Sequence, residues 1–233
     1  MPSARPILFS APMVRALLAG TKTQTRRLVK PQPERYAVSS EGLADGLCEV
    51  AVEISDRDPL PRLRLGRVIT LQTCPYGTPG DLLWVRETWA VSTIYDGVSP
   101  RDVPQCGVRY AASEERLGIK DRPSIFMPRW ASRLTLEITE VRVQRLEDIS
   151  EQDAIAEGVV KIRDCCHVIR DVDYDLVGLC HTSPITPYAK LWDTLNGDKP
   201  GMAWADNPWV WALTFKVHTA NVDAVLAAAK EPV

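Results

Sequence analysis

A lysine, a threonine and two arginines lie close together near the start of the chain, and side chains of these types could carry out nucleophilic chemistry. Thr25 is a weak nucleophile, because its hydroxyl stays protonated at neutral pH unless a base adjoins it. Lys22 is the nearest candidate base, but its pKa of about 10.4 must fall by roughly three units, at a cost of about 4 kcal/mol, to act near pH 7. Desolvation or the cations Arg26 and Arg27 could lower it. Alternatively, Lys22 is a solvated loop lysine or a phosphate anchor, and Thr25 only satisfies backbone donors in a turn.

Glu157 occupies an unfavourable position in the predicted structure. Residues 150–157 are predicted to form a short helix, and a carboxylate in its last turn lies against the negative end of the helix dipole. The cost is roughly a few tenths of a kcal/mol, and departures of this kind tend to mark functional positions. A salt bridge to Lys161 or Arg163 would explain the position equally well.

A second group of candidates lies in residues 84–89. Arg86 and Glu87 interrupt a predicted strand, so at least one of these charges faces inward or into a cavity, where it must be paired. A polar pocket and a buried structural ion pair would each account for it. Trp84 and Trp89 share no face under strict alternation, so one is expected in the core and the other in a cleft, where its ring could stack on a base. The predicted substrate-binding residues are Arg26, Arg27, Trp84, Arg86 and Glu87.

The cysteines lack the spacing of a disulfide framework, so we expect free thiols in a reducing compartment. Cys165, Cys166 and His167, with Cys180 and His181, could offer ligands to zinc. Adjacent cysteines point in divergent directions, however, and the spacing fits none of the strong zinc patterns. The sequence therefore predicts neither a metal site nor a cofactor.

Three short helices are predicted. The first spans residues 12–19, with Pro12 in its first turn and Gly20 as a left-handed exit. The second spans 150–157, with Ser150 as N-cap and Gly158 as exit, and the third spans 188–195. Residues 21–27 are polar and short of core residues, so they are expected to form an exposed loop.

Strands are predicted over residues 66–72, 82–89, 134–143 and 209–217. In the third, Leu134, Leu136 and Ile138 share one face, whereas Val141 and Val143 have the opposite parity. A bulge or bend near Glu140 would reconcile the two halves. Residues 31–62 and 161–187 are predicted insertions, and the tail 218–233 is expected to form a helix or to fray.

Composition narrows the class of protein. A net charge of -2 and a pI of about 6.0 give no basic field typical of a general nucleic-acid binder. No apolar run approaches the roughly 20 residues of a membrane span, and the start lacks a secretory signal, so a cytoplasmic protein is expected. Residues 1–233 are interpreted as one globular domain with its core at about 5–217.

Two basic clusters could contact phosphate or be solvated faces: Arg26, Arg27 and Lys30, and Arg62, Arg64 and Arg67.

The stretch Gly20-Thr21-Lys22-Thr23-Gln24-Thr25-Arg26-Arg27 fits the pattern GxKxxTxR and resembles the signature loop of the ASCH domain family, GxKxxExR. The resemblance implies an α+β fold, a small β-barrel of the PUA-like superfamily with flanking short helices and long loop insertions. From Arg5 to Lys216 the chain also resembles a phage and prophage group of ASCH-like proteins, some of them labelled morphogenetic.

Thr25 replaces the acidic residue of the signature, as in the bacterial N(4)-acetylcytidine amidohydrolases, whose loop lysine and threonine act with a glutamate near the end of a helix. By this resemblance the catalytic roles fall on Lys22, Thr25 and Glu157. The implied function is a metal-independent amidohydrolase that acts on an N-acylated pyrimidine nucleoside or base in the cytoplasm of a bacterial host cell, with Thr25 as nucleophile and Lys22 as base.

Two other functions stay open. A non-catalytic module for RNA, single-stranded or modified nucleic acid would use the same cleft, and its affinity would fall steeply with salt. A structural role in a phage particle is the third hypothesis, and the sequence leaves the oligomeric state undetermined.

Overall fold

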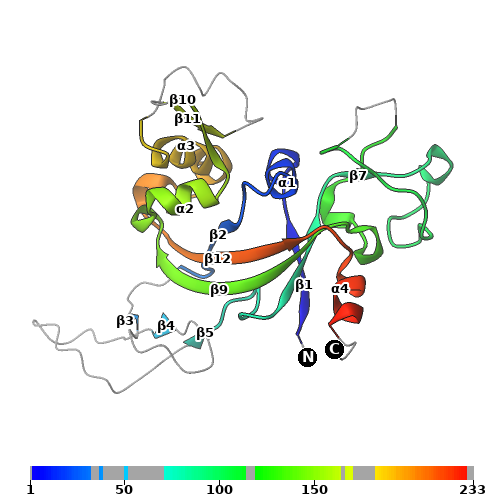
Figure 1. Cartoon of the computed structure of the whole chain (residues 1–233), viewed down its shortest axis with the longest axis horizontal. Coiled ribbons are helices and arrows are strands. Elements are labelled where there is room, and N and C mark those ends of the chain that lie inside the picture. Colours follow the sequence, from blue (N-terminus) through cyan, green and yellow to red (C-terminus); the bar gives the residue numbers. More distant parts are fainter. Residues whose placement is uncertain are drawn as a thin grey trace, which may run out of the picture.

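The computed structural model of the chain describes residues 2–32, 37–38, 50–51, 71–113, 119–163, 166–169 and 182–229. Its central feature is a curved sheet in the strand order β1-β6-β9-β12-β2 (Figure 1). These strands are β1 (Ala4–Leu8), β2 (Gln24–Leu28), β6 (Leu82–Arg86), β9 (Thr135–Arg145) and β12 (Trp209–His218). β1 lies parallel to β6, and the other neighbours are antiparallel. The predicted α+β class is confirmed, but the described strands form an open sheet with β1 and β2 at its edges, not a closed barrel.

The three predicted helices are present, and α1 and α2 end where the local signals indicate. They are α1 (Ala11–Leu18), α2 (Glu151–Ala156) and α3 (Ile185–Asn196), which begins three residues earlier than predicted. A fourth helix, α4 (Val222–Ala228), forms in the tail. Ser150 caps α2 by accepting a hydrogen bond from the Asp153 amide at 3.0 Å. Gly20 and Gly158 follow α1 and α2 with φ of 70° and 107°, conformations that favour glycine.

Shorter elements surround the sheet. A hairpin of β10 (Val159–Arg163) and β11 (Cys166–Ile169) lies beside α2 and α3 at one end of the molecule, and β7 (Trp89–Ala90) and β8 (Arg109–Tyr110) pair at the other (Figure 1). A small sheet contains β3 (Ala37–Val38), β4 (Val50–Ala51) and β5 (Leu71–Gln72). Single 3-10 turns occur at Thr93–Tyr95, Ser124–Phe126, Arg129–Ala131, Leu146–Asp148 and Trp204–Asp206. Most of the predicted insertion 31–62 and of the predicted strand 66–72 lies outside the described residues, as do Arg62, Arg64 and Arg67.

The bend predicted in the longest strand is confirmed. Thr214 of β12 pairs with Glu140 of β9, whereas the next residue, Phe215, pairs with Ile138. Thr139 is therefore an extra residue, and it points to solvent together with Glu140. This bulge lets the buried residues on both sides of it face one core despite their opposite parity.

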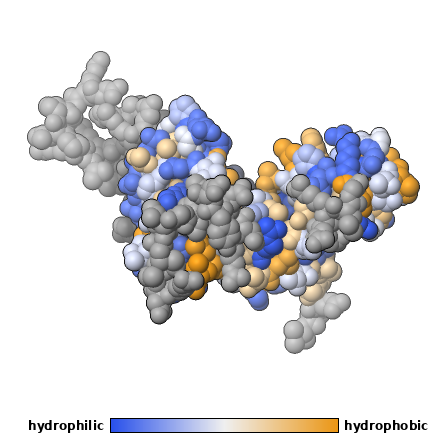
Figure 2. All heavy atoms as spheres, turned by 90° about the horizontal axis from the view of Figure 1, so that it is seen from above, coloured by the Kyte–Doolittle hydropathy of each residue, from blue (hydrophilic) through white to orange (hydrophobic). Residues whose placement is uncertain are grey.

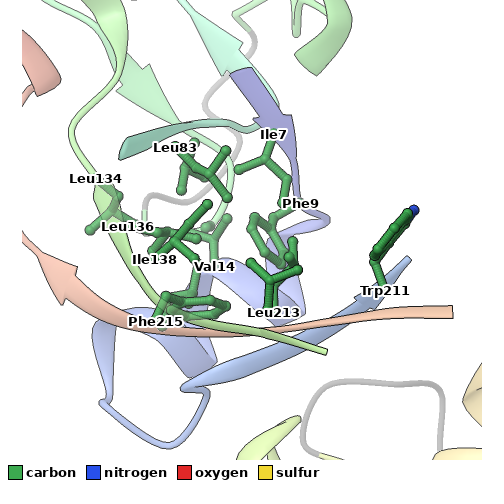
Figure 3. Packing of buried hydrophobic residues seen from close by; sticks show 14 of the residues in the cluster. Ile7, Phe9, Val14, Leu83, Leu134, Leu136, Ile138, Trp211, Leu213 and Phe215 are labelled. Carbon is green, nitrogen blue, oxygen red and sulfur yellow. The ribbon is translucent and has the colours of Figure 1, made fainter. Parts of the chain in front are cut away.

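The main core lies between α1 and one face of the sheet (Figure 3). α1 contributes Val14 and Leu17, one helical turn apart, and β12 contributes Trp211, Leu213 and Phe215 from alternate positions. The opposite face of β12 packs on a second cluster with α2 and α3. That cluster comprises Leu146, Ile149, Ala154, Val159, Tyr188, Trp192 and Val210. β12 thus separates two hydrophobic layers.

The C-terminal segment is anchored rather than frayed. Asn221 caps α4 by accepting from the Asp223 amide, and its side-chain amide donates to three backbone carbonyls, those of Arg129, Trp130 and Ser132, at 2.8 to 3.3 Å. Val222 is fully buried against β6. Of the alternatives for the tail, the structure shows a packed helix.

Within the described ranges, no helix combines the length and apolarity needed to cross a membrane. Figure 2 shows hydrophilic and hydrophobic residues intermixed on the face seen from above. Among the residues that the structure describes, the most exposed large hydrophobic side chain is that of Ile94, followed by Phe126 and Ile125.

Candidate active site

The basic stretch after α1 is largely buried, contrary to the prediction of an exposed loop. The Thr21 and Lys22 amides donate to the Ala16 carbonyl at the end of α1, and the Thr23 amide donates to the Ala156 carbonyl at the end of α2. From Gln24 onward the chain pairs with β12 as the edge strand β2. Polar composition was misleading here because the buried charges find carboxylate partners that are distant in sequence.

The two faces of β2 point in different directions. Leu213 and Trp211 of β12 lie opposite Thr25 and Arg27, so these pairs share the face of the main core. Arg26 lies on the other face, toward α2 and α3. Because β2 is an edge strand, side chains of both faces can border one cavity at its open side.

Lys22 and Glu157 form a buried ion pair. The Lys22 Nζ lies 2.6 Å from Glu157 Oε2 and 2.8 Å from the Glu157 carbonyl oxygen, and the two residues are 1% and 8% exposed. Glu157 is the C-cap of α2, so the ammonium group offsets both the carboxylate and the negative end of the helix. This contact compensates for the unfavourable position of a carboxylate at the end of α2.

Burial lowers the pKa of Lys22 below the ordinary lysine value of 10.5, and the nearby charges of Arg27 and Arg26 act in the same direction. The carboxylate of Glu157 opposes this shift. Desolvation and the neighbouring cations therefore shift the pKa of Lys22 in the direction that a lysine base requires.

Arg26 links Glu157 to a second carboxylate. Its guanidinium contacts Glu157 Oε1 at 3.2 Å and Asp153 Oδ2 at 2.8 Å, and it donates to Gln24 Oε1 at 2.6 Å. Burial would raise the pKa of Asp153, but hydrogen bonding from Gln24 and the charges of Arg26 and Arg142 outweigh it, so the pKa falls. Asp153 and Glu157, which lie one helical turn apart at the end of α2, therefore hold the Arg26 guanidinium in place.

Tyr188 of α3 completes the surroundings of Glu157. Its hydroxyl donates to Glu157 Oε1 at 3.3 Å, and burial followed by the Glu157 charge raises its pKa well above the ordinary value. The hydroxyl is thus a donor at neutral pH. Sequence reasoning missed Tyr188, since a buried helical tyrosine has the same sequence signature whether it serves the core or a site.

A cavity of about 430 Å³ lies at the open side of β2, within the range of small-molecule sites. Its lining residues are Met13, Thr25, Arg26, Arg27, Leu28, Lys30, Pro75, Tyr76, Glu157, Tyr188, Leu191, Trp192, Leu195, Asn196 and Lys199. Thr25 is 3% exposed, and within the described part of the chain its hydroxyl makes no hydrogen bond. Lys22 contacts Glu157 but does not itself line the cavity, and no hydrogen bond among the described residues joins Lys22 to Thr25.

A second cavity of about 360 Å³ shares Met13, Glu157 and Leu191 with the first. Its other lining residues come mainly from α1 and from β10 and β11. Glu157 therefore lines both cavities, whereas Thr25 lines the first.

Trp84, Arg86 and Glu87, predicted to bind substrate, line neither cavity. Trp84 is buried against α4, and the Arg86 guanidinium lies 4.5 Å from the centre of its ring. Glu87 is 1% exposed and accepts two hydrogen bonds from Arg133, each of 2.9 Å. Of the two explanations for Glu87, the structural ion pair is the one observed.

No group of three or more His, Cys, Asp or Glu side chains in the described ranges could hold a metal ion. Of the five candidate zinc ligands, Cys165, Cys180 and His181 lie outside the described residues. Cys74 and Cys106 are thiols that form no disulfide within the described part of the chain.

A scan against family models, a search of curated proteins and a search of solved structures each find no match for this chain.

Proposed function

We propose that the 430 Å³ cavity is the active site of a metal-independent amidohydrolase that acts on an N-acylated pyrimidine nucleoside or base such as N(4)-acetylcytidine. The observation that carries the proposal is the buried pair of Lys22 and Glu157, whose carboxylate borders the same cavity as Thr25. With it we propose that the chain is a cytoplasmic ASCH-like protein with a PUA-like fold, on the strength of the GxKxxTxR stretch and of the curved sheet.

In the proposed reaction the Thr25 hydroxyl attacks the acyl carbon, and the neutral amine of Lys22 accepts the hydroxyl proton. Collapse of the tetrahedral intermediate breaks the C–N bond, and Lys22 returns the proton to the exocyclic nitrogen of the leaving base by way of Glu157, whose carboxylate contacts Lys22 and borders the cavity. Water then hydrolyses the acyl-threonine ester, which releases the carboxylic acid and restores Thr25. Glu157 orients Lys22 and, because it borders the cavity, can also contact the exocyclic nitrogen.

The lining of the cavity supports a nucleobase ligand. Tyr76, Tyr188 and Trp192 supply aromatic rings for stacking, and Asn196 supplies an amide for hydrogen bonds to the base edge. Arg26 and Arg27 also line the cavity, and their positive charges lower the electrostatic cost of the oxyanion of the intermediate.

The test is release of cytidine and acetate from N(4)-acetylcytidine, followed by chromatography. Thr25→Ala should lose turnover by about a thousandfold or more, while Thr25→Ser, which keeps a hydroxyl, should retain part of it. Since the Thr25 hydroxyl makes no hydrogen bond within the described part of the chain, both variants should keep the wild-type melting temperature. Unchanged turnover in Thr25→Ala would remove the proposed nucleophile.

The alternative is a module that binds RNA or modified nucleic acid in this cavity without chemistry. It is favoured by the absence, among the described residues, of a hydrogen bond between Thr25 and Lys22, and by the lining cations Lys30 and Lys199. This alternative predicts no acetate release and an affinity for single-stranded RNA that falls steeply between low and moderate salt.

A further inference from the structure

The cavity beside β2 carries more positive charge than its own carboxylate can balance. Its lining contains four cations, Arg26, Arg27, Lys30 and Lys199, and within the described part of the chain Glu157 is its one carboxylate. Glu157 is already engaged by Lys22 and by Arg26, and Arg26 also binds Asp153. The other three lining cations therefore depend on other partners.

Arg27 is the most informative of these. The side chain is half-buried, its Nη2 donates to the Leu8 carbonyl at 2.6 Å, and its guanidinium lies 5.0 Å from the centre of the Phe9 ring. Its Nε is buried without a hydrogen-bond partner, and no salt bridge to a carboxylate is found for it in the described ranges. Partial burial of a guanidinium that makes no salt bridge is costly. Such a group at the wall of a cavity indicates a ligand that brings the negative charge.

Lys30 and Lys199 extend the positive charge toward solvent. Both side chains are exposed, and among the described residues the acceptors of Lys199 Nζ are neutral: the Leu195 carbonyl and the Asn196 side-chain oxygen, each at 2.9 Å. Lys30 has no ion pair within the described residues. A half-buried arginine backed by two exposed lysines offers several donors to one anion, the arrangement that suits a phosphate.

We propose that Arg27, with Lys30 and Lys199, binds a phosphate group of the ligand, so that the substrate is a phosphorylated nucleoside rather than the free nucleoside. The inference rests on the proposed function for the nucleoside part of the ligand, since the aromatic rings of Tyr76 and Trp192 would hold the base. The overall charge of -2 does not oppose it, because the contacting charges are local.

The experiment compares binding of cytidine, cytidine 5′-monophosphate and a short oligocytidylate with a 5′-hydroxyl by titration calorimetry at low salt. We expect the monophosphate or the oligonucleotide to bind about tenfold or more tightly than cytidine. A preference for the monophosphate identifies a phosphomonoester, and a preference for the oligonucleotide identifies a phosphodiester. Arg27→Gln should reduce the preference to less than about threefold, whereas Arg27→Lys should retain most of it.

The double variant Lys30→Gln/Lys199→Gln alters exposed side chains only, so it should fold and lower the preference while cytidine affinity stays the same. Lys216→Gln removes an exposed lysine that does not line the cavity and should leave the preference intact. Equal affinity for cytidine and both phosphorylated ligands, or a preference unchanged in all the cavity variants, would overturn the inference. Turnover of neutral N(4)-acetylcytidine and its dependence on Thr25 test the proposed function separately, because that substrate carries no phosphate.

Discussion

At the scale of single residues, the state of Lys22 decides what the site can do. A lysine that bonds a carboxylate and a helix-end carbonyl is held in its charged form by those partners, while burial favours the neutral amine. The proposed chemistry needs the neutral amine. Turnover should therefore rise with pH as Lys22 loses its proton, with a midpoint below the ordinary 10.5.

Replacing Glu157 by glutamine should move that midpoint to lower pH. The Glu157 charge raises the pKa of Lys22, so a neutral side chain at this position leaves the lowering effects of burial and of Arg27 and Arg26 less opposed. The measurement is the pH profile of kcat/KM for N(4)-acetylcytidine in Glu157→Gln. Glu147→Gln, which changes an exposed glutamate away from the cavity, should keep the wild-type midpoint. A midpoint that moves upward in Glu157→Gln would show that another group controls the profile.

Glu87 illustrates a buried charge with a structural role. Its two hydrogen bonds to Arg133 are part-buried, with the Arg133 side chain 24% exposed, so solvent reduces their strength. We expect Glu87→Gln to lower the free energy of unfolding by about 1–3 kcal/mol, measured by urea denaturation, with KM unchanged. A several-fold rise of KM at unchanged stability would return Glu87 to the substrate site.

At the scale of elements, α4 tests how the C-terminal segment contributes to stability. Asn221 both caps this helix and donates to three carbonyls near Arg129. Asn221→Ala should lower the free energy of unfolding by about 2–3 kcal/mol. Asn221→Asp keeps the oxygen that caps α4 but loses the three hydrogen bonds that the amide donates. The urea midpoint of this variant therefore gives the part of the stability loss that is due to those three bonds. A loss below about 0.5 kcal/mol in the alanine variant would mean that α4 packs independently of this residue.

Elements whose signals are local could be predicted from the sequence. Gly20, Ser150 and Gly158 mark the ends of α1 and α2 because a cap or a left-handed residue acts on its immediate neighbours. The bulge at Thr139 could be predicted because the parity of buried residues changes there. β2 could not, since the burial of Arg26 depends on carboxylates contributed by α2.

The same distinction applies to the candidate site. Lys22, Thr25 and Glu157 were identified from a loop pattern and from the placing of a carboxylate at a helix end, and the structure brings Lys22 and Glu157 into contact. Tyr188 had no local signal, because its hydrogen bond to Glu157 arises only when α3 packs on α2. Strand alternation predicts that one of Trp84 and Trp89 lies in the core and the other in a cleft. It cannot tell which face a helix such as α4 covers, and Trp84, predicted to bind substrate, is buried against that helix.

At the scale of the whole molecule, the site and the fold depend on the same charges. Asp153 connects α2 to Arg26 of β2 and to Arg142 of β9. Its pKa in the folded protein lies below the ordinary 3.8, so the carboxylate stabilises the fold above that pH, and this contribution is lost as pH falls through the folded value.

Acid sensitivity should consequently decrease when Asp153 is neutralised. Asp153→Asn is expected to melt at a lower temperature than wild type at pH 6, but to lose less melting temperature between pH 5 and pH 3. Differential scanning calorimetry across that range is the measurement, with Asp96→Asn, a change at an exposed carboxylate, as the matched control. If the melting temperatures of Asp153→Asn and wild type fall equally between pH 5 and pH 3, then other carboxylates cause the acid unfolding.

The open sheet leaves β1 as an outer edge, and its residues limit the addition of a strand from another molecule. The Phe9 amide and the Ser3 carbonyl bond toward β6, so in this parallel pairing the backbone groups of the even-numbered residues point outward. Pro6 occupies one of these outward positions and has no amide to offer a docking strand. At Leu8 the outward carbonyl already accepts the Arg27 side chain. The outward edge of β1 thus lacks a donor at Pro6 and has an occupied acceptor at Leu8, two features that disfavour the addition of a strand from another molecule.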